Sequence, residues 1–510
     1  MDDTTLATST EPRHGADSVR ELVVVAWLAV ICAAPLGCRR ADPGPALQIV
    51  GESTRLRIED PVPAETPWLV GGRVKLVAAR GETLGIQVLQ RARVAVSLTV
   101  ATPGVTVEGY EVDSFVVTRP STEMYGGGRA GTFADGLTAV QVPASNPAYF
   151  EISVSGAVPP GTYSGDLAVG ELHMPVDLRV VVATLPPLQA RVWAYADPRE
   201  LRSTGAAPTA EEVQCAKLFA AHGVWLTPDL HLDWYAARRA LVAGMHDLPV
   251  VISDDPAIAG GEVRAWIEAT RGSGVVPFAI PLDEPTTPEA RAKVIALAKA
   301  VRAAGGGPTT FRYALTDQPR PEYGDLIDLY ISLRAPRSAN GAQWTYNGAP
   351  PRAGSMVLDG ATPGPRTWGW IGYRFRLPVW YVWDALYWHD RHNRKDTPLA
   401  SRALNAAQDP VSFDGGEDHG NLDGVLALPA PRGCRPTLRL AAIRRGLYDR
   451  QLLELATVCD PSATAVLAEK LVPIALGDAP ATGAGSWPTD EAAWELARRE
   501  LLELASCTPR

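Results

Sequence analysis

Between Trp68 and about Pro187 the chain alternates apolar and polar residues, or runs apolar for a few positions, between breaks of Gly, Pro and Asp. Alternation with a period of two residues is typical of a strand that buries one face. The clearest examples are residues 74–78, 84–89, 94–100 and 176–182. Two packed sheets would bury these faces, so we predict an N-terminal β-sandwich over residues 67–188.

After Gln189 the pattern changes to short apolar runs that alternate with longer stretches of helical periodicity. The runs that indicate strands are residues 192–195, 224–226, 248–252, 275–282, 311–315, 326–331, 343–346 and 379–383. The first four are followed by helical stretches at 210–221, 232–243, 261–270 and 288–303. Strand–helix alternation at this spacing implies βαβ units around a parallel sheet. We therefore predict a (β/α)8 barrel over residues 189–435 with irregular later units, and a C-terminal helical segment over residues 436–510.

An apolar run near the N-terminus indicates export. Residues 22–31 are uncharged and apolar, follow Arg13 and Arg20, and belong to an uncharged stretch that ends at Gly37. This stretch is shorter than the roughly 20 residues that span a bilayer as a helix, so we predict a signal peptide over residues 1–37.

The end of this segment resembles the cleavage box of bacterial lipoproteins, in which the cysteine becomes the lipidated first residue. The matching residues are Leu36-Gly37-Cys38, although Pro35 stands where that box prefers Leu. Residues 38–66 are rich in Pro, Arg and Glu and would form a tether. We expect the protein in the cell envelope, either anchored through a lipid on Cys38 or free in the periplasm or the medium.

Export changes how the remaining cysteines are interpreted, because an oxidising compartment permits disulfides. Cys459 and Cys507 each follow a predicted helix and could pair with each other. Buried free thiols explain Cys215, Cys434 and these two cysteines equally well.

Composition narrows the classes of function. The 510 residues are 46% hydrophobic and 21% charged, as in globular proteins of two or three domains. The net charge of −9 argues against nucleic acid or an anionic lipid surface as a partner. The sequence has neither zinc-type Cys/His spacing nor a phosphate-binding glycine motif, so we expect no metal and no cofactor. A lipid on Cys38 would be the one link to a membrane.

Two adjacent acids, Asp283 and Glu284, follow the apolar run at 275–282 and precede Pro285. By the strand count they end the fourth barrel strand, and barrels place their chemistry at the C-terminal ends of the strands. Neighbouring carboxylates repel each other, which favours the protonated form of one of them, as a general acid requires. The proline also fits a solvated turn, in which the two acids would have no catalytic role.

Cleavage of a glycosidic bond usually needs two carboxyl groups. Retaining barrel glycosidases place an acid Glu after strand four and a nucleophilic Glu after strand seven. Glu284 could be the first, but no Glu occurs between Glu322 and Glu417. Either a later aspartate such as Asp359 or Asp384 completes the pair, or the 2-acetamido group of an N-acetylhexosamine is the nucleophile. The second route needs two carboxylates side by side, because one orients the acetamido N–H while its neighbour protonates the leaving oxygen.

Aromatic residues are concentrated in the later part of the predicted barrel. Six of the 14 tryptophans lie between residues 344 and 388, with tyrosines interleaved. Aromatic rings dock the flat C–H faces of sugars, although packing of the last barrel strands is the commoner role for any one ring. Trp344 and Tyr346 lie two positions apart on a predicted strand end, and so on one face, which favours the pocket for both.

Several segments resemble, in order, glycoside hydrolase family 123 and a large related group of uncharacterised bacterial proteins. They comprise Ala79-Arg-Gly-Glu82 to Gln87, the turn from Pro159 to Gly165, Asp283-Glu284-Pro285, Trp344-Thr-Tyr346, Asp359 with Arg366-Thr-Trp-Gly-Trp370, and Arg439 to Asp449. Each segment is weakly specific, but the ordered set runs from about residue 70 to residue 456. The resemblance implies an N-terminal β-sandwich followed by a catalytic barrel.

Members of family 123 release β-linked N-acetylgalactosamine by the substrate-assisted route. By this resemblance Asp283 would orient the acetamido group, Glu284 would be the general acid/base, and Tyr346 would donate a hydrogen bond to the acetamido oxygen. Further substrate contacts would come from Trp344, Asp359, Arg366, Trp370 and Trp383. The sequence departs from the wider group near the end of the barrel, where Leu422-Asp423-Gly424 replaces Gly-Asp-Gly and Leu428-Pro429-Ala430 replaces Tyr-Pro-Gly.

We therefore expect an exported glycoside hydrolase that acts on terminal β-linked N-acetylhexosamine, with N-acetylgalactosamine favoured, and needs no metal. Two alternatives stay open. One is a non-catalytic surface lipoprotein that binds glycan in the same pocket. The other is a conventional glycosidase that combines Glu284 with a later aspartate. A purely structural envelope protein would lack a concave, aromatic-lined cleft at Glu284.

Overall fold

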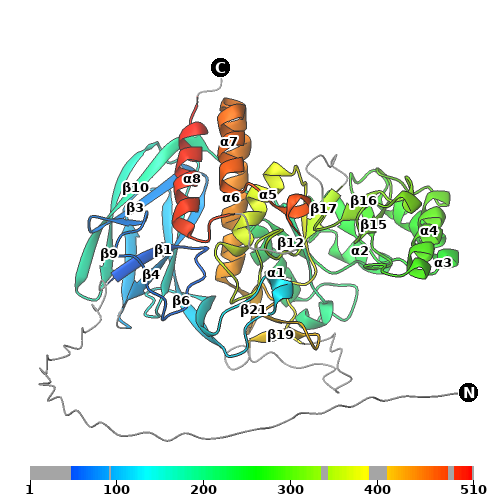
Figure 1. Ribbon diagram of the computed structural model, residues 1–510, viewed down its shortest axis with the longest axis horizontal. Coiled ribbons are helices and arrows are strands. Elements are labelled where there is room, and N and C mark those ends of the chain that lie inside the picture. The colour runs from blue at the N-terminus through cyan, green and yellow to red at the C-terminus, as the bar shows by residue number, and fades with distance from the viewer. Residues whose placement is uncertain (1–46, 91–92, 335–342, 390–409, 481–486, 508–510) are drawn as a thin grey trace, which may run out of the picture. The chain divides into compact units, whose positions relative to one another are not determined.

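The computed structural model describes residues 47–90, 93–334, 343–389, 410–480 and 487–507 (Figure 1). The predicted signal peptide, the lipidation site at Cys38 and the first part of the expected tether lie outside these residues. None of the described helices is long and apolar enough to cross a membrane.

The N-terminal part, residues 47–184, forms two five-stranded sheets, drawn in blue to cyan-green in Figure 1. The first has the order β1 (Leu47–Gly51), β4 (Thr83–Gln90), β8 (Ala148–Val154), β6 (Val105–Val117), β7 (Gly131–Val140). The second has the order β2 (Leu69–Val70), β3 (Arg73–Arg80), β10 (Leu172–Thr184), β9 (Gly161–Val169), β5 (Val96–Val100). Ile86 and Ile152 of the first sheet share one buried core with Leu76 and Leu178 of the second. We call this part the two-sheet region.

The predicted tether over residues 38–66 is wrong in its later part, because strand β1 lies within it. It pairs antiparallel with β4, from Leu47 opposite Gln90 to Gly51 opposite Ile86. The side chain of Gln87 donates hydrogen bonds to the carbonyls of Gly51 and Thr54, at 2.9 and 3.1 Å. Residues 47–54 are therefore part of the first sheet and its edge rather than of a linker.

The predicted barrel is confirmed as a nearly closed barrel of eight parallel strands. In chain order they are β11 (Val192–Tyr195), β12 (Val224–Thr227), β13 (Asp247–Pro249), β14 (Val276–Ala279), β15 (Arg312–Leu315), β16 (Leu329–Ile331), β17 (Gln343–Tyr346) and β18 (Trp380–Val382). The last strand pairs with the first, Val192 lying opposite Trp380. Between β12 and β13 a single parallel bridge, Leu230 with Val250, connects the two neighbours.

Four helices follow the first four strands: α1 (Ala210–Ala221), α2 (Leu232–Arg238), α3 (Pro256–Thr270) and α4 (Pro288–Ala303). The side chains of Thr209 and Thr287 accept hydrogen bonds from the third residue of α1 and α4, so each helix begins at a cap that the sequence encodes. The later units are irregular, as expected. A 3-10 turn, Pro321–Tyr323, lies between β15 and β16, and α5 (Thr367–Arg374) lies between β17 and β18.

Two short hairpins and three helices complete the described chain. The hairpins are β19 (Val411–Asp414) with β20 (His419–Asn421), and β21 (Ala427–Ala430) with β22 (Gly433–Pro436). The helices are α6 (Leu438–Cys459), α7 (Pro461–Leu471) and α8 (Glu491–Leu504). The hairpins were not predicted from the sequence.

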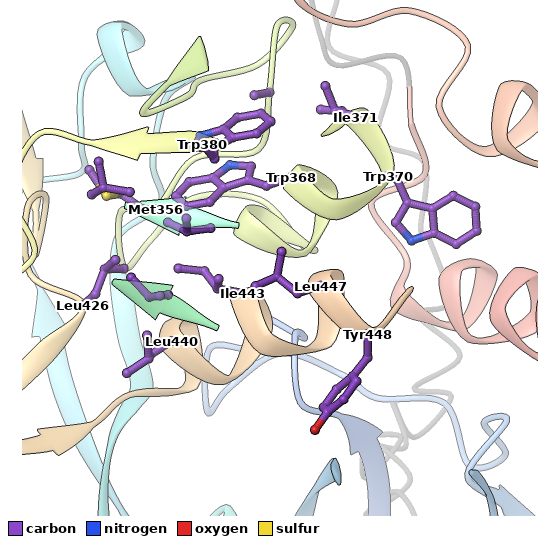
Figure 2. Close-up of a cluster of buried hydrophobic side chains, with 14 of the residues drawn as sticks. Met356, Trp368, Trp370, Ile371, Trp380, Leu426, Leu440, Ile443, Leu447 and Tyr448 are labelled. Carbon is purple, nitrogen blue, oxygen red and sulfur yellow. The ribbon is translucent and has the colours of Figure 1, made fainter. Parts of the chain in front are cut away.

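Helix α6 is buried over most of its length. Figure 2 shows its residues Ile443 and Leu447 directed at Trp368 of α5, which stacks on Trp380 of β18 with ring centroids 5.1 Å apart. The two helices approach closely at Gly369, where an added Cβ would lie 1.7 Å from the carbonyl oxygen of Gly446. This contact leaves no room for a side chain and seats α6 directly against the barrel part.

Two disulfides link distant segments. Cys215 of α1 pairs with Cys434 of β22, and Cys459 at the end of α6 pairs with Cys507. The pairing expected for Cys459 and Cys507 is thus confirmed, and the alternative of four free thiols is wrong.

Candidate active site

The acid pair lies beyond the C-terminal end of β14, the fourth barrel strand, as predicted. The strand itself is buried, with Phe278 1% exposed, and the chain then bends before Asp283 and Glu284, whose side chains are exposed. Glu284 has a φ of 39°, in the left-handed region that residues with a side chain seldom adopt. Such a conformation costs of order 1–3 kcal/mol, and it persists where the surrounding structure holds it.

Thr316 holds this bend. It follows β15, and its hydroxyl accepts a hydrogen bond from the backbone N–H of Glu284 at 2.9 Å. The same hydroxyl donates to Oδ1 of Asp283 at 2.5 Å. One threonine therefore fixes both members of the pair, which explains how adjacent residues on a chain can converge at one strand end.

Tyr346, the last residue of β17, contacts the pair from a third strand. Its hydroxyl donates a hydrogen bond to Oε1 of Glu284 at 2.8 Å. Burial, followed by the carboxylates of Glu284 and Asp283, raises the pKa of Tyr346 well above its ordinary value. The phenol therefore stays protonated and available as a donor at neutral pH.

An aromatic layer fills the barrel interior next to these groups. Trp193 stacks on Tyr381 with centroids 4.7 Å apart, and Phe278 meets Trp193 and Trp344 edge-on at 5.5 and 5.1 Å. Trp344 is 2% exposed. Its predicted place in the pocket is therefore wrong, because its ring packs the barrel core while Tyr346, on the same face, reaches the strand end.

A cavity of about 320 Å³ opens beside Glu284, within the range of about 300–1,000 Å³ that is usual for small-molecule sites. The residues that line it come from the ends of β14, β15, β16 and β17 and the segments that follow: Glu284, Pro285, Thr286, Thr316, Asp317, Gln318, Arg320, Ile331, Ser332, Leu333, Arg334, Tyr346 and Arg352. Its wall is polar except for Pro285, Ile331, Leu333 and the tyrosine ring.

Further carboxylates surround the barrel mouth. Burial and the charges of Asp229, Asp283 and Asp384 raise the pKa of Tyr381 well above its ordinary value. Asp384 is 1% exposed, and its carboxylate accepts the backbone N–H of Leu386 at 2.8 Å. Asp229 follows β12 and is exposed. It is a further acid at the barrel mouth that was not predicted from the sequence. Its position three residues after the predicted strand at 224–226 was the available signal.

Asp359, predicted to contact substrate, lies elsewhere. Its carboxylate accepts hydrogen bonds from the N–H and hydroxyl of Ser121 at 2.8 and 2.6 Å, and from the side-chain amide of Asn421 at 3.0 Å. It is 1% exposed. A carboxylate so enclosed by protein donors can neither reach a sugar nor be the second catalytic acid, and the prediction is wrong.

Arg366 and Trp370 are likewise fully buried, away from the acid pair. Arg366 pairs with Asp449 at 2.8 Å and Glu491 at 3.2 Å, and the indole N–H of Trp370 donates to the same Asp449 at 2.9 Å. Figure 2 shows the Trp370 ring directed away from Trp368. Their predicted role as substrate ligands is wrong, because they hold α5 against α6 and α8.

Trp383 is half-buried and packs against Tyr387 and Phe413, with centroids 4.9 and 5.9 Å apart. Its side chain and that of Tyr125 form hydrogen bonds with the buried carboxyl of Asp423. Leu422, where the related group has Gly, takes a φ of 51° and is fully buried. The altered segment 422–424 therefore contributes to the packing under Trp383, and it does not line the cavity at Glu284.

Replacing Asp423 with Asn is expected to raise the free energy of unfolding at pH 7 by about 2–3 kcal/mol. Burial raises the pKa of Asp423 from 3.8 to about 6. As the pH rises, the carboxyl therefore ionises in the unfolded protein before it ionises in the folded protein. The free energy of unfolding consequently falls between about pH 4 and about pH 6. Asn accepts the same hydrogen bonds without ionising. Urea unfolding should show the gain growing between pH 4 and pH 7, and a gain that is constant with pH would contradict the ionisation argument.

Among the described residues, no group of three or more His, Cys, Asp or Glu side chains is arranged to hold a metal ion. The groups that meet at the acid pair, Asp283, Glu284 and Tyr346, can transfer protons and form hydrogen bonds.

Comparisons with known proteins bear on the fold. No protein-family model matches the chain, and no curated protein matches it. Among solved structures, a family 123 glycoside hydrolase from Clostridium perfringens, described for glycolipid glycan hydrolysis, matches 90% of this chain and 97% of its own. The TM-score is 0.58 and the sequence identity 10%.

Two further solved structures match less closely. A Bacteroides fragilis protein assigned as an α-galactosidase covers 65% of this chain and 74% of its own, at a TM-score of 0.25 and 10% identity. A family 2 glycosyl hydrolase from Bacteroides cellulosilyticus covers 60% and 44%, at a TM-score of 0.24 and 9% identity. These two are too dissimilar to carry an argument. The resemblance to family 123 that the sequence indicates is confirmed at the level of the fold.

Proposed function

We propose that the protein is an exported glycoside hydrolase with a β-sandwich domain beside its barrel. It removes terminal β-linked N-acetylhexosamine, with N-acetylgalactosamine favoured, by a substrate-assisted, retaining mechanism. The observation that carries the proposal is the convergence of Asp283 and Glu284 on one threonine at the barrel mouth, with Tyr346 on the second acid. Export and a lipid on Cys38 rest on residues outside those described, and fatty-acid labelling of the protein tests the anchor.

In the proposed first step the acetamido oxygen attacks C1 of the same sugar, and the bond from C1 to the leaving oxygen breaks. Glu284 gives its proton to that oxygen. Asp283 accepts a hydrogen bond from the acetamido N–H and stabilises the positive charge of the ring that forms. In the second step a water attacks C1, gives a proton to Glu284 and restores the acetamido group, so the configuration at C1 is retained.

Tyr346 would change partners during this cycle. In the free protein its hydroxyl donates to Glu284. A bound acetamido oxygen would offer the phenol a second acceptor, and transfer of this hydrogen bond would free Glu284 to face the leaving oxygen. The raised pKa of Tyr346 keeps the donor proton in place throughout.

The first test is turnover by wild-type protein. It should hydrolyse 4-nitrophenyl β-N-acetylgalactosaminide faster than the corresponding β-galactoside, and the thiazoline analogue of the ring intermediate should inhibit it. Absence of cleavage of both N-acetylgalactosaminide and N-acetylglucosaminide would exclude the mechanism. Binding without turnover would favour a glycan-binding protein.

A conventional two-carboxylate glycosidase is the second candidate. Its second carboxylate would be Asp229, which is exposed at the barrel mouth, rather than Asp359 or Asp384, which are buried. In that mechanism the acetamido group is dispensable. Equal turnover of galactoside and N-acetylgalactosaminide, together with inactivity of an Asp229→Asn variant, would support it against the substrate-assisted route.

Removal of the Thr316 hydroxyl should disturb the pair without touching the sugar. Thr316→Val deletes the acceptor of the Glu284 N–H and the donor to Asp283. We expect kcat to fall about tenfold or more, the effect of one lost hydrogen bond to a charged group, with little change in KM. Thr316→Ser keeps the hydroxyl and should restore most of kcat. A fall confined to KM would contradict a positioning role.

A further inference from the structure

The cavity beside Glu284 carries more positive than negative side chains. Three arginines line it, Arg320, Arg334 and Arg352, against two carboxylates, Glu284 and Asp317. Arg320 is neutralised by Asp317, whose carboxylate lies 2.5 Å from its guanidinium. Asp317 also accepts the hydroxyl of Tyr323 at 3.1 Å.

The other two arginines have no acidic partner in the part of the chain that the structure describes. Across the ranges that the structure describes, neither Arg334 nor Arg352 forms an ion pair, whereas Arg320 does. Arg334 is exposed and follows β16, and Arg352 is half-buried. Both residues line the cavity, and neither is paired with a described carboxylate.

The backbone of Arg352 is fixed. Its N–H donates to the carbonyl of Ala349 at 3.0 Å, and its carbonyl accepts the N–H of Leu476 at 2.9 Å. The N–H of Arg334 donates to the hydroxyl of Ser332 at 3.1 Å. The segment of Arg352 is thus tied to that of Leu476, whereas the hydrogen bond at Arg334 lies within its own turn.

A neutral sugar in this cavity would displace water from two guanidinium groups, and its hydroxyl groups would compensate little of the lost hydration. An oxyanion would instead give charge-assisted hydrogen bonds, for which the planar fork of arginine is suited. The protein as a whole carries a net charge of −9 and repels anions at long range. A local excess of arginine beside the acid pair is therefore a feature of the site and not of the surface in general.

We propose that the cavity binds an anionic glycan, in which Arg334 and Arg352 hold an oxyanion close to the sugar that is cleaved. The oxyanion is either a sulfate ester on the N-acetylhexosamine or the carboxylate of a uronic acid linked to it. This inference rests on the proposed function and narrows its substrate class.

The kinetic test compares 4-nitrophenyl β-N-acetylgalactosaminide, its 6-sulfate, and a disaccharide of β-N-acetylgalactosamine on glucuronic acid. At low salt we expect kcat/KM to be at least about tenfold higher for one anionic substrate than for its neutral counterpart, which is the unsulfated glycoside or the corresponding disaccharide on glucose. The preference should shrink as salt is raised. The anionic substrate that is preferred identifies the sulfate or the uronate as the source.

Variants connect this preference to the two arginines. Arg334→Gln and Arg352→Gln should each reduce the ratio of anionic to neutral kcat/KM by about tenfold, the effect of one hydrogen bond to a charged group. Arg93→Gln removes an exposed arginine before β5 and should leave the ratio unchanged. A ratio that neither cavity variant alters would overturn the inference.

Calorimetry keeps the inference separate from catalysis. Full-length Glu284→Gln protein should bind 6-sulfated N-acetylgalactosamine, or the glucuronic acid disaccharide, more tightly than N-acetylgalactosamine. Loss of that difference in Arg334→Gln and Arg352→Gln would support the site even if wild-type protein hydrolyses nothing. Cleavage of the neutral substrate with no preference in binding or turnover would overturn this inference and leave the proposed function standing.

Discussion

Replacement of Glu284 by Gln is expected to lower kcat/KM for a β-N-acetylgalactosaminide at least about 100-fold, because general acid catalysis typically contributes about 10²–10⁴-fold. Gln is nearly isosteric and can still accept the hydroxyl of Tyr346, so the geometry of the strand end should survive. It cannot protonate the leaving oxygen or take a proton from water. Steady-state rates with a sugar leaving group measure the effect most directly, since such a leaving group needs the proton most.

The controls for this variant are another glutamate and the neighbouring aspartate. Glu289→Gln removes an exposed carboxylate from the first turn of α4 and should leave the rate unchanged. Asp283→Asn should impair acetamido sugars far more than plain galactosides, because its proposed partner is the acetamido N–H. A Glu284→Gln enzyme that stays within about twofold of wild type would exclude the general-acid role, whose loss should cost far more.

The barrel was predictable because its signals are local. The run at 343–346 coincides with β17, and the helical stretches at 210–221 and 288–303 coincide with α1 and α4, which begin at threonine caps. Strand β1 was missed because five residues in a proline-rich segment carry no periodicity, and its partner β4 lies more than 30 residues further along the chain.

The residues of the candidate site were likewise predictable only where their signal is local in the sequence. Asp283 and Glu284 were predictable because a strand that stops at two acids is visible in eight residues. Thr316 was not, because 32 residues separate it from Glu284 and only the pairing of β14 with β15 brings it close. A role for Arg334 and Arg352 can be inferred only from the cavity that both residues line.

The resemblance motifs misled the site prediction for a physical reason. Arg366, Trp370 and Asp449 belong to segments that carry the resemblance, yet they meet one another in a fully buried polar junction. Helix α6 shows the same effect, because its charged residues Arg444 and Arg445 are buried against Glu52, Glu82 and Glu151. A buried ion network and a solvated face have the same sequence pattern.

The second large effect is expected at the start of α6, where Asp135→Ala should lower the free energy of unfolding by about 3–5 kcal/mol. Asp135 of β7 is 1% exposed and accepts two hydrogen bonds from Arg439 of α6, at 3.0 and 2.9 Å. The same guanidinium donates to the carbonyls of Met356 and Leu422 at 2.9 and 2.8 Å. Removal of the aspartate leaves a fully buried positive charge bound only to neutral carbonyls, and urea unfolding measures the cost.

The matched control is an exposed ion pair that links the same two parts of the chain. Asp113 of β6 pairs with Arg435 of β22, and both side chains are more than a quarter exposed, so Asp113→Ala should cost no more than about 1 kcal/mol. If the penalty at Asp135 comes from an uncompensated charge, replacing both partners by apolar residues of similar size, Asp135→Leu with Arg439→Met, should recover most of the stability. If the double variant loses as much stability as the single variant, the effect comes from the shape of this contact. The double variant has no buried charge, so an uncompensated charge could not explain its loss.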